Sequence, residues 1–429
     1  MSTSAGTDRE HVVVLHRWRD RHARYDAYLD HRELRVSYVT TELGLSSVPE
    51  DAAAVRIVAA TDDRTETAAA VADLVARFGP ASRLVALNEG DLDTAAELRV
   101  AFGLPGQTPE ELNRFRDKLA MVRLADSAGV RVPAYASADT VEDVRAFAGR
   151  HGWPVVLKPR RGTASRGVVL LRDTDELDAH EAMFRPGRHE PRIVQCFVPD
   201  AILHIDGLWT GDALGPFRVS RYVNNCESFT KGSFLGSVEV DEPEVLTALG
   251  GFTAAVAEAL GDGRPWVFHL EAFLGRAEDG TPRPVFLEAG ARVGGGEIPF
   301  VWREVHGLDL MAAAADIQLG RPPVVTAVAT APTDGRHADE RHTTAGWLLL
   351  PLPVPPPCEV TAVSWSAPAA PDGPYARAVP GPGQVVPAAG GYEHVAARFR
   401  FRGTSSRAVE AALRKTAESF AVTCRPLPR

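Results

Sequence analysis

Short apolar runs alternate with polar, helix-length segments in the first part of the chain. The runs are rich in Val, Ile, Leu and Ala, as buried strands are, and cover 12–15, 34–39, 55–60 and 84–87. Residues 65–78, between the last two runs, place apolar side chains three to four positions apart, which predicts a helix. Strands separated by helical segments indicate an open parallel α/β sheet.

A polar loop follows the last of these runs and contains Asn88, Glu89 and Asp91. Parallel sheets bind ligands beyond the carboxyl ends of their strands, so these side chains are candidates for a binding site. Capping of the next helix is the interpretation that we favour for them.

The middle of the chain changes from a helical to an extended pattern. Apolar residues spaced three to four apart predict a helix from Leu112 through Ala125. A capping-box pattern at 140–143 predicts a second helix, which ends at Gly152. Two apolar segments within 153–171 then flank a loop of small residues with a glycine at each end, which predicts a hairpin with a flexible tip.

The remaining periodic segments are shorter and more scattered. Further helices are predicted over 244–260, 308–319 and 405–420. Strands are predicted over 193–199, 204–209, 217–223 and 347–350. The segment 395–402 alternates apolar and basic residues, which predicts a half-exposed strand.

A second predicted hairpin carries two carboxylates on facing strands. Its first strand, 267–274, is apolar and aromatic with Glu271 inside it, residues 278–281 supply a turn, and its second strand ends at Glu288. Burying an unpaired carboxylate is costly, so each should meet a cation, either a basic side chain or a metal ion. Hard oxygen ligands, few in number, suit Mg²⁺ that is held jointly with nucleotide phosphates.

Cationic and glycine-rich segments accompany this hairpin. Arg292 follows Glu288 by four residues, and the glycines 294–296 let the backbone approach a ligand closely. Lys158 lies in the strand before the small-residue loop, whose N–H groups can form an anion site. Together these features predict a phosphate-handling site; taken alone, the hairpin could equally be an exposed edge with an ordinary glycine loop.

Composition narrows the class of protein. A chain of 429 residues is expected to hold two to four domains. The formal net charge of −9, with only short basic segments, argues against a nucleic-acid partner. We predict a cytoplasmic protein without a membrane segment, because residues 1–10 are polar and no apolar run is long enough to span a bilayer. The four cysteines show no metal-ligand or redox spacing and are predicted to be reduced thiols.

The order of these motifs resembles the ATP-grasp superfamily over residues 112–320. The motifs are Lys118 on a helix, Lys158 before a glycine-bounded loop, the strand Gln195-x-Phe-Val198, Glu271, and Glu288-x-x-x-Arg292. Within the superfamily the chain is similar to carboxylate–amine ligases such as the L-amino acid ligases. The resemblance implies an N-terminal α/β domain at 1–111, an ATP-grasp domain at 112–320 with a lid subdomain at about 130–198, and a small α+β domain at 321–429.

The resemblance also implies roles for individual residues, with ATP and Mg²⁺ as cofactors and Mn²⁺ as an alternative metal. ATP would be bound by Lys118, Lys158, Gly162, Ser165, Gly167, Gln195, Cys196 and Val198. Glu271 and Glu288 would hold the metal. Arg292 would steady the transferred phosphate and the tetrahedral intermediate, and Lys158 would share this catalytic role. Our candidates for substrate contact are His204, Asp206, Arg221, Gly295 and Gly296, with a purely structural role as the alternative.

Two positions depart from the superfamily pattern. Gly290 stands where the family usually has an asparagine, so one metal-ligand oxygen is missing; a water or Glu297 is the candidate replacement. Ile202 stands where a ribose-binding glutamate is usual, so ribose recognition should differ.

The resemblance implies a reaction between a small-molecule carboxylate and a small-molecule amine. ATP would activate the carboxylate as an acyl phosphate, and the amine would then form an amide or peptide bond with release of ADP and phosphate. One rival is a biotin carboxylase-like enzyme that phosphorylates bicarbonate. Another is a non-catalytic nucleotide-binding module, against which the intact set of Lys158, Glu271, Glu288 and Arg292 argues. A homodimer is the candidate oligomer, because two-fold dimers are the commonest closed assembly.

Overall fold

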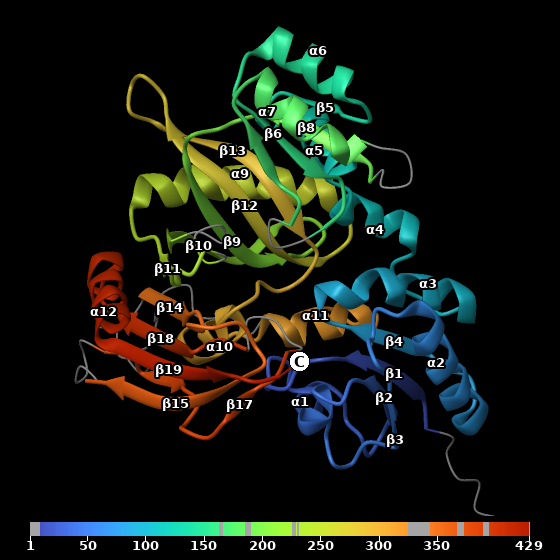
Figure 1. The fold of residues 1–429 in the computed structure, drawn as a ribbon. Coiled ribbons are helices and arrows are strands. Elements are labelled where there is room, and N and C mark those ends of the chain that lie inside the picture. Colours follow the sequence, from blue (N-terminus) through green and yellow to red (C-terminus); the bar gives the residue numbers. More distant parts are fainter. Residues whose placement is uncertain are drawn as a thin grey trace, which may run out of the picture.

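The structure is a computed structural model. It describes residues 9–162, 166–184, 190–224, 229, 231–324, 344–366, 373–388 and 394–428. Figure 1 shows the N-terminal part in blue and the C-terminal part in red side by side, with the middle of the chain standing above both.

The N-terminal part is the predicted open parallel sheet. Its strands are β1 (His11–His16), β2 (Arg35–Thr40), β3 (Ala54–Ile57) and β4 (Arg83–Ala86), in the order β3-β2-β1-β4. Its helical elements are α1 (Tyr25–Tyr28), η1 (Gly44–Ser47), α2 (Arg64–Phe78), η2 (Glu89–Asp91) and α3 (Leu92–Phe102). The four predicted strands and the predicted helix at 65–78 are confirmed.

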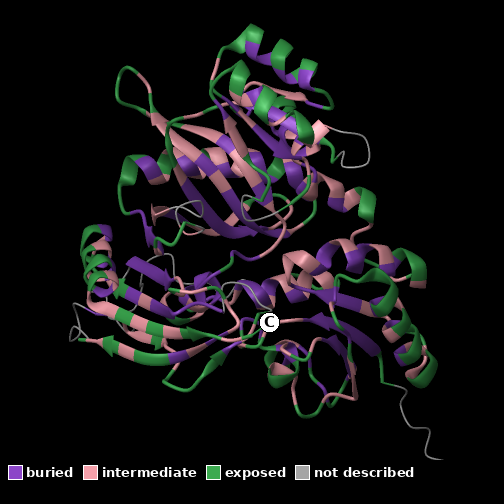
Figure 2. Ribbon diagram, viewed as in Figure 1, coloured by how far each residue is buried: buried purple, intermediate pink, exposed green. Residues whose placement is uncertain are grey.

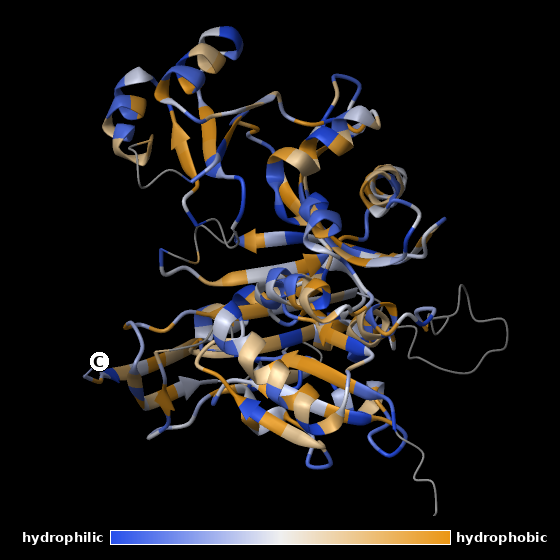
Figure 3. Ribbon diagram, turned by 90° about the vertical axis from the view of Figure 1, so that its right-hand side faces the viewer, coloured by the Kyte–Doolittle hydropathy of each residue, from blue (hydrophilic) through white to orange (hydrophobic). Residues whose placement is uncertain are grey.

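An eight-stranded antiparallel sheet forms the centre of the molecule. Its strands are β9 (Ala201–Trp209), β10 (Leu214–Asn224), β11 (Leu235–Glu239), β12 (Trp266–Arg276), β13 (Pro282–Gly290), β14 (Thr344–Leu350), β16 (Ala376–Ala378) and β18 (Ala397–Gly403). They lie in the order β13-β12-β9-β10-β11-β14-β18-β16. The sheet therefore continues across residue 321, where the sequence suggested a domain boundary. Figure 3 shows apolar and polar residues alternating along several strands, as expected for sheets with two different faces.

The segment predicted to be the lid subdomain, and called the lid below, forms a smaller antiparallel sheet covered by helices. It contains β5 (Tyr135–Ser137), β6 (Val155–Pro159), β7 (Val169–Leu171) and β8 (Arg192–Cys196), with α6 (Val141–His151), α7 (Thr174–Ala179) and η3 (Glu181–Phe184). The order is β5-β8-β6-β7, so the hairpin predicted at 153–171 is confirmed. Thr140 and Asp143 form the predicted capping box at the start of α6.

The single helix predicted from Leu112 is wrong, because the structure has two. These are α4 (Pro109–Arg116) and α5 (Lys118–Ser127). Asp117 separates them in an extended conformation, accepts the N–H groups of Leu119 and Ala120, and pairs with Arg160 of the lid. Lys118 is therefore the first residue of α5.

Three further helices connect the parts. They are α9 (Pro243–Gly261), α10 (Ile298–Val305) and α11 (Leu310–Gln318); α9 and α11 were predicted, whereas α10 was not. Of the described residues, only those of α9 form a helix long and apolar enough to cross a membrane by length and composition. Its buried side chains, among them Val245, Leu249 and Val256, pack in one core with residues of β9 and β12, as in a core helix.

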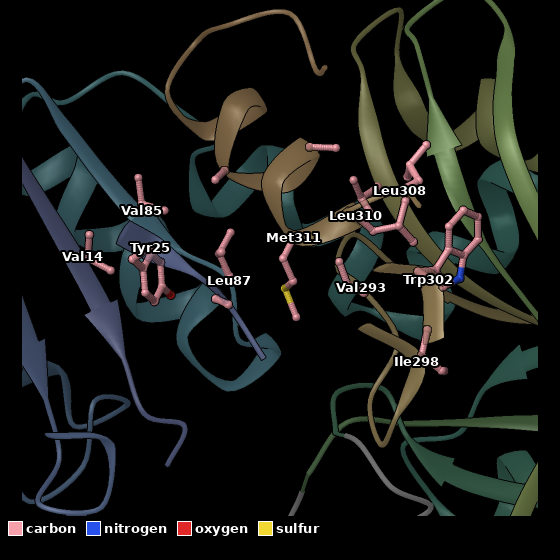
Figure 4. Close-up of a cluster of buried hydrophobic side chains, with 14 of the residues drawn as sticks. Val14, Tyr25, Val85, Leu87, Val293, Ile298, Trp302, Leu308, Leu310 and Met311 are labelled. Atoms are coloured by element: carbon pink, nitrogen blue, oxygen red, sulfur yellow. The ribbon is translucent and has the colours of Figure 1, made fainter. Parts of the chain in front are cut away.

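Helix α11 joins the parallel sheet to the rest of the molecule. Figure 4 shows Met311 between Leu87, which follows β4, and Val293, which follows β13. Trp302 and Leu310 belong to the same core. The N-terminal sheet is thereby packed against the segment that carries Arg292.

The C-terminal part adds a second layer. Its three-stranded sheet has the order β17 (Val385–Val386), β15 (Cys358–Trp365), β19 (Phe420–Pro426), and its helix is α12 (Ser406–Ser419), as predicted. The prediction that the strand near 395–402 is half-exposed is wrong for most of its length. Phe399 and Phe401 are buried with α12 side chains such as Leu413, and Arg398 is buried as well. Figure 2 shows buried residues gathered along the strands in the middle of the molecule.

Candidate active site

A row of polar residues crosses one face of the central sheet. Glu288 of β13 lies directly opposite Glu271 of β12, and Glu271 lies opposite His204 of β9. His204 is paired in turn with Ser220 of β10, and Ser220 with Glu239 of β11. Directly opposite residues project to the same side of a sheet. The two carboxylates of the predicted hairpin therefore face the same space.

Lys118 reaches this pair from the start of α5. Its Nζ lies 3.4 Å from Glu288 Oε2 and donates to the carbonyl oxygen of Gly162 at 2.9 Å. The N–H groups of the first turn of α5 are already bonded: that of Lys118 donates to the Arg160 carbonyl, and those of Leu119 and Ala120 donate to the Asp117 carboxylate. The positive charge of the Lys118 ammonium is therefore what this end of α5 offers to an anion that comes close to Glu288.

Lys158 and Gln195 lie on one face of the lid sheet. Gln195 pairs with Val156, and Lys158 is two residues further along the same strand, so the three side chains share a face. Leu157 points the other way, into the lid core. Burial lowers the pKa of Lys158 to about 8, although Glu288 opposes this shift. The lid therefore presents a lysine that is largely removed from water and close to Glu288.

The loop after Lys158 has a backbone that only glycine accepts easily. Gly162 has φ of +134° and Gly167 has φ of +71°. A Cβ at Gly167 would also lie 2.9 Å from the side chain of Pro159. Ser165, the other residue predicted to contact ATP from this loop, lies outside the described residues.

The end of β8 and the residues after it were predicted to contact adenine through their main-chain groups. The Cys196 N–H donates to the Ala134 carbonyl at 2.9 Å, and the Phe197 N–H donates to that of Pro154 at 3.3 Å. None of the described residues accepts the N–H of Val198. Val198 is therefore the position of this segment with a main-chain donor to spare.

Arg292 is held by a residue of the N-terminal part. Its Nε donates to Glu89 Oε2 at 2.8 Å, and Arg116 donates to the other oxygen at 2.7 Å. Burial alone would raise the pKa of Glu89, but Arg292 and Arg116 outweigh it and lower that pKa. The predicted capping role belongs to Asn88, whose side chain accepts the N–H of Gly90. Glu89 is instead bonded to Arg292, a predicted site residue, and its place after a parallel strand was the signal in the sequence for such a position.

His204 and Asp206, predicted to contact the substrate, lie behind the carboxylates. Their side chains are only 1% and 2% exposed. Asp206 Oδ2 lies 2.7 Å from His204 Nδ1, and Oδ1 lies 2.8 Å from His269 Nδ1. His204 Nε2 lies 2.7 Å from Ser237 Oγ. The adjoining cavity of about 10 Å³ has room for one water at most, so neither side chain faces a space in this structure that could hold a substrate.

The three close side chains raise the question of a second metal site. His204, Asp206 and His269 are near enough to hold an ion. However, both imidazole nitrogens that face Asp206 already lie at hydrogen-bond distance from it. We therefore interpret the cluster as a hydrogen-bonded network.

The structure also separates Arg221 from the site. Arg221 Nη2 lies 3.2 Å from Glu410 Oε2 on α12, and Nη1 lies 3.6 Å from Glu242. The next residue, Tyr222, donates to Glu271, and adjacent residues of a strand project to opposite faces. Arg221 therefore links the central sheet to the C-terminal part.

The predicted glycine segment packs on the polar network and on the C-terminal part. A Cβ on Gly294 would lie 2.4 Å from Asp206 Oδ1. The Gly295 carbonyl accepts the N–H of Ile298 at the start of α10. A Cβ on Gly296, which has φ of +62°, would lie 3.4 Å from the Trp347 ring. The absence of side chains here lets the chain pass close over the buried sheet face.

Glu297 is excluded as a replacement ligand for the metal. It is 2% exposed, its Oε1 accepts from Arg398 at 3.2 Å, and its Oε2 lies 3.3 Å from Arg400. Gly290, at the position of the missing asparagine, would carry a Cβ no closer than 3.5 Å to its nearest neighbour, Arg292. Glu271 and Glu288 are thus the residues that could hold Mg²⁺, and their hard oxygen donors suit it.

A larger cavity lies away from this cluster. It has a volume of about 540 Å³ and lies between residues 21–24 and helix α10. Arg21 forms an ion pair with Asp26 there, and Arg24 forms one with Asp309. The positive charges of these two arginines are therefore already balanced by carboxylates of the chain.

The fold is shared with enzymes of known structure. The L-amino acid ligase of Bacillus licheniformis matches with a TM-score of 0.67 and 17% identity over 96% of this chain and 98% of its own. The biotin carboxylase domain dimer of Hydrogenobacter thermophilus 2-oxoglutarate carboxylase, in complex with MgADP and bicarbonate, matches with a TM-score of 0.66 and 16% identity over 97% of this chain and 91% of its own.

Relatives in sequence match shorter segments, and no protein-family model matches the chain. The L-arginine-specific L-amino acid ligase of Bacillus subtilis is 24% identical over 265 residues, 59% of this chain and 61% of the relative. An uncharacterised protein of Sinorhizobium fredii is 43% identical over 88 residues, 20% of this chain and 18% of the relative. The chain thus spans less than two thirds of the length of either relative.

These comparisons define the class of protein by its fold. The matched structures are ATP-grasp enzymes, and the chain has the ATP-grasp fold, as its motifs predicted. L-amino acid ligases occur both among the structures and among the sequence relatives.

Proposed function

We propose that the protein is an ATP-dependent carboxylate–amine ligase that forms an amide or peptide bond through an acyl phosphate. One observation carries the proposal. Glu271 and Glu288 face the same space from neighbouring strands, with Lys118 Nζ 3.4 Å from Glu288 and the buried Lys158 close enough to lower the pKa of Glu288. Paired carboxylates and paired lysines are what a site for a metal–nucleotide complex needs.

The nucleotide half of the site would use the lid. Phosphoryl transfer depends on positioning and on neutralising charge, more than on covalent help from the protein. Lys118 and Lys158 would contact the ATP phosphates, and the glycine-bounded loop would cover them. Gln195 and the Val198 N–H would meet the adenine. Mg²⁺ bound to Glu271 and Glu288 would supply charge neutralisation on the phosphate oxygens.

The substrate half would be built around Arg292. An oxygen of the substrate carboxylate attacks the γ-phosphorus, ADP leaves, and the acyl phosphate forms. The amine nitrogen then attacks the acyl carbon, phosphate leaves with the transferred oxygen, and the amine loses its proton. Arg292, oriented by Glu89, would stabilise the negative charge that develops in both steps.

Amino acids are the substrate class that we propose. The name of one sequence relative and that of one matched structure specify L-amino acid ligases. A biotin carboxylase-like reaction is the second candidate, because a biotin carboxylase matches the fold almost as well. In that reaction bicarbonate, in place of an amino-acid carboxylate, would be phosphorylated by ATP. That matched domain is a dimer, and a homodimer stays a proposal for this chain.

The test is phosphate release from ATP and Mg²⁺ with a panel of amino acids, singly and in pairs, and with bicarbonate. Ligation requires release that depends on a pair and that is lost in Glu288→Ala. Glu278→Ala is the matched control, because Glu278 is an exposed residue in the turn of the same hairpin. Release that depends on bicarbonate and not on amines would support the second candidate. ATP binding without release under any condition would contradict both.

A further inference from the structure

The metal carboxylate Glu271 is supported from below by side chains that the proposed reaction does not use. The Tyr222 hydroxyl donates to Glu271 Oε1 at 2.8 Å. Tyr222 lies on β10, two strands away from β12, so its ring must cross over β9 to reach Glu271. The residue of β9 opposite Glu271 is His204, and the Tyr222 ring packs on it with ring centroids 4.9 Å apart.

A second ring lies next to Glu271. His269 is two residues earlier on β12 and so shares its face, and its Nε2 lies 3.9 Å from Glu271 Oε1. The ring centroids of His204 and His269 are 5.4 Å apart. Asp206 joins the two rings, because one carboxylate oxygen bonds to each of them. A single buried carboxylate thus fixes the orientation of both imidazoles.

The network is buried at His204 and Asp206, and both oxygens of Asp206 are bonded. Ser237 completes the hydrogen bonds of His204, and the Gly294 backbone covers Asp206 so closely that a Cβ would meet it. Ile298, Trp302 and Trp347 line the small cavity behind it. In surroundings of this kind a bonded polar group is held firmly, since breaking a hydrogen bond would leave a buried donor or acceptor unpaired.

We propose that Tyr222 and Asp206 are positioning residues for the metal ligand Glu271. Tyr222 fixes one carboxylate oxygen directly, and Asp206 acts through the rings of His204 and His269 that flank it. The inference rests on the proposed function, in which Glu271 holds the metal. Groups that orient a ligand in this way commonly change metal affinity by 10- to 100-fold when they are removed. Among the described residues, Glu288 is not held by such a network; its charged neighbours include Lys118 and Lys158.

The test is the affinity of the ADP complex for Mn²⁺, measured by the electron paramagnetic resonance signal of the free ion. Tyr222→Phe removes one hydroxyl and keeps the ring on His204, and we expect it to weaken Mn²⁺ binding about tenfold. Asp206→Asn replaces one acceptor oxygen with a donor, so one of the two rings must rotate or change tautomer; we expect a loss of similar size. ADP binding in the presence of EDTA should be unchanged, which a general loss of structure would not give.

The matched control is Tyr375→Phe. Tyr375 also donates a hydrogen bond to a glutamate, at 2.9 Å, but it lies in the C-terminal part. The affinity of the Tyr375→Phe variant for Mn²⁺ should therefore stay within twofold of that of the wild type. Glu271→Gln separates the two levels of the proposal. If Glu271→Gln weakens Mn²⁺ binding while Tyr222→Phe and a folded Asp206→Asn stay within twofold of wild type, only the positioning role is overturned. If Glu271→Gln leaves Mn²⁺ binding unchanged, both the metal site and the positioning role are contradicted. If Asp206→Asn does not fold, the Mn²⁺ affinity of Tyr222→Phe alone tests the positioning role.

Discussion

Glu271 and Glu288 are the same residue type, face the same space and pair across one hairpin, yet their charges are balanced differently. Glu288 lies 3.4 Å from Lys118 and close to Lys158, both of which come from outside the central sheet. Glu271 accepts a hydrogen bond from Tyr222, and its other close neighbour is His269, within the sheet. One carboxylate thus meets side chains of α5 and of the lid sheet, and the other is bonded within the central sheet. The difference suggests that nucleotide charge is handled on the Glu288 side and metal geometry on the Glu271 side.

The largest effects should come from removing either charge. We expect Glu271→Gln and Glu288→Gln each to lower ATP-dependent phosphate release about 10²- to 10³-fold, because both residues are proposed ligands of the metal. Their stabilities should differ. Glu288→Gln leaves two lysines without a balancing charge and should lower the free energy of unfolding by ~1 kcal/mol, a modest loss because Glu288 is partly exposed. Glu271→Gln keeps an oxygen for Tyr222 and should lower it less. Equal losses in urea unfolding would contradict the comparison.

Arg292 should give the next largest effect. Arg292→Lys keeps the charge but loses the planar group that binds Glu89, so we expect kcat to fall about 10²-fold. The KM for ATP should change little, because Arg292 lies on the substrate side. Arg283→Lys, at an exposed position of strand β13, which precedes Arg292, is the control for steady-state kinetics. A change in the KM for ATP with kcat unchanged would place Arg292 on the nucleotide side instead.

The affinity for ATP should depend on alkaline pH through Lys158. Burial lowers the pKa of Lys158 from 10.5 to about 8, so the free protein loses this positive charge as the pH rises through 8. Binding a phosphate then requires proton uptake, and the affinity for ATP should fall by up to about tenfold per pH unit above 8. Isothermal titration between pH 7 and 9 measures this dependence. In Lys158→Arg the guanidinium stays charged and the dependence should disappear; a slope that remains there would assign it to another group.

Arg221 should give the smallest effect. It faces away from Tyr222 and Glu271 and pairs with Glu410 and Glu242. Arg221→Ala should leave phosphate release within twofold of wild type and cost ~0.5 kcal/mol of stability, as exposed ion pairs do. A loss of activity as large as that of Tyr222→Phe would mean that the two faces of β10 are not functionally distinct.

Local patterns predicted the elements that surround the site. Two short apolar runs separated by turn residues predicted the carboxylate hairpin, and the capping box predicted the start of α6. The break at Asp117 was missed because apolar spacing continues through it. Only the capping bonds of Asp117 and its pairing with Arg160 reveal the break.

Residues whose roles depend on distant partners could not be predicted in the same way. His204 alternates along its strand as a half-exposed residue would, and its burial arises from the sheet strands and the Gly294 segment packed around it. Glu89 meets Arg292 across 203 positions of the sequence, which no local spacing encodes. The buried strand near Phe399 was mistaken for a half-exposed one, because its basic residues pair with acidic residues of other segments.

One isotope measurement tests the central claim most directly. The amino acid whose carboxylate is activated would be labelled with ¹⁸O in that carboxylate and incubated with ATP, Mg²⁺ and the amine that supports phosphate release. An acyl phosphate requires one carboxylate oxygen to leave with the phosphoryl group. Mass spectrometry should therefore find released phosphate that carries one ¹⁸O atom. Phosphate without the label, released at the same rate, would contradict the ligase mechanism.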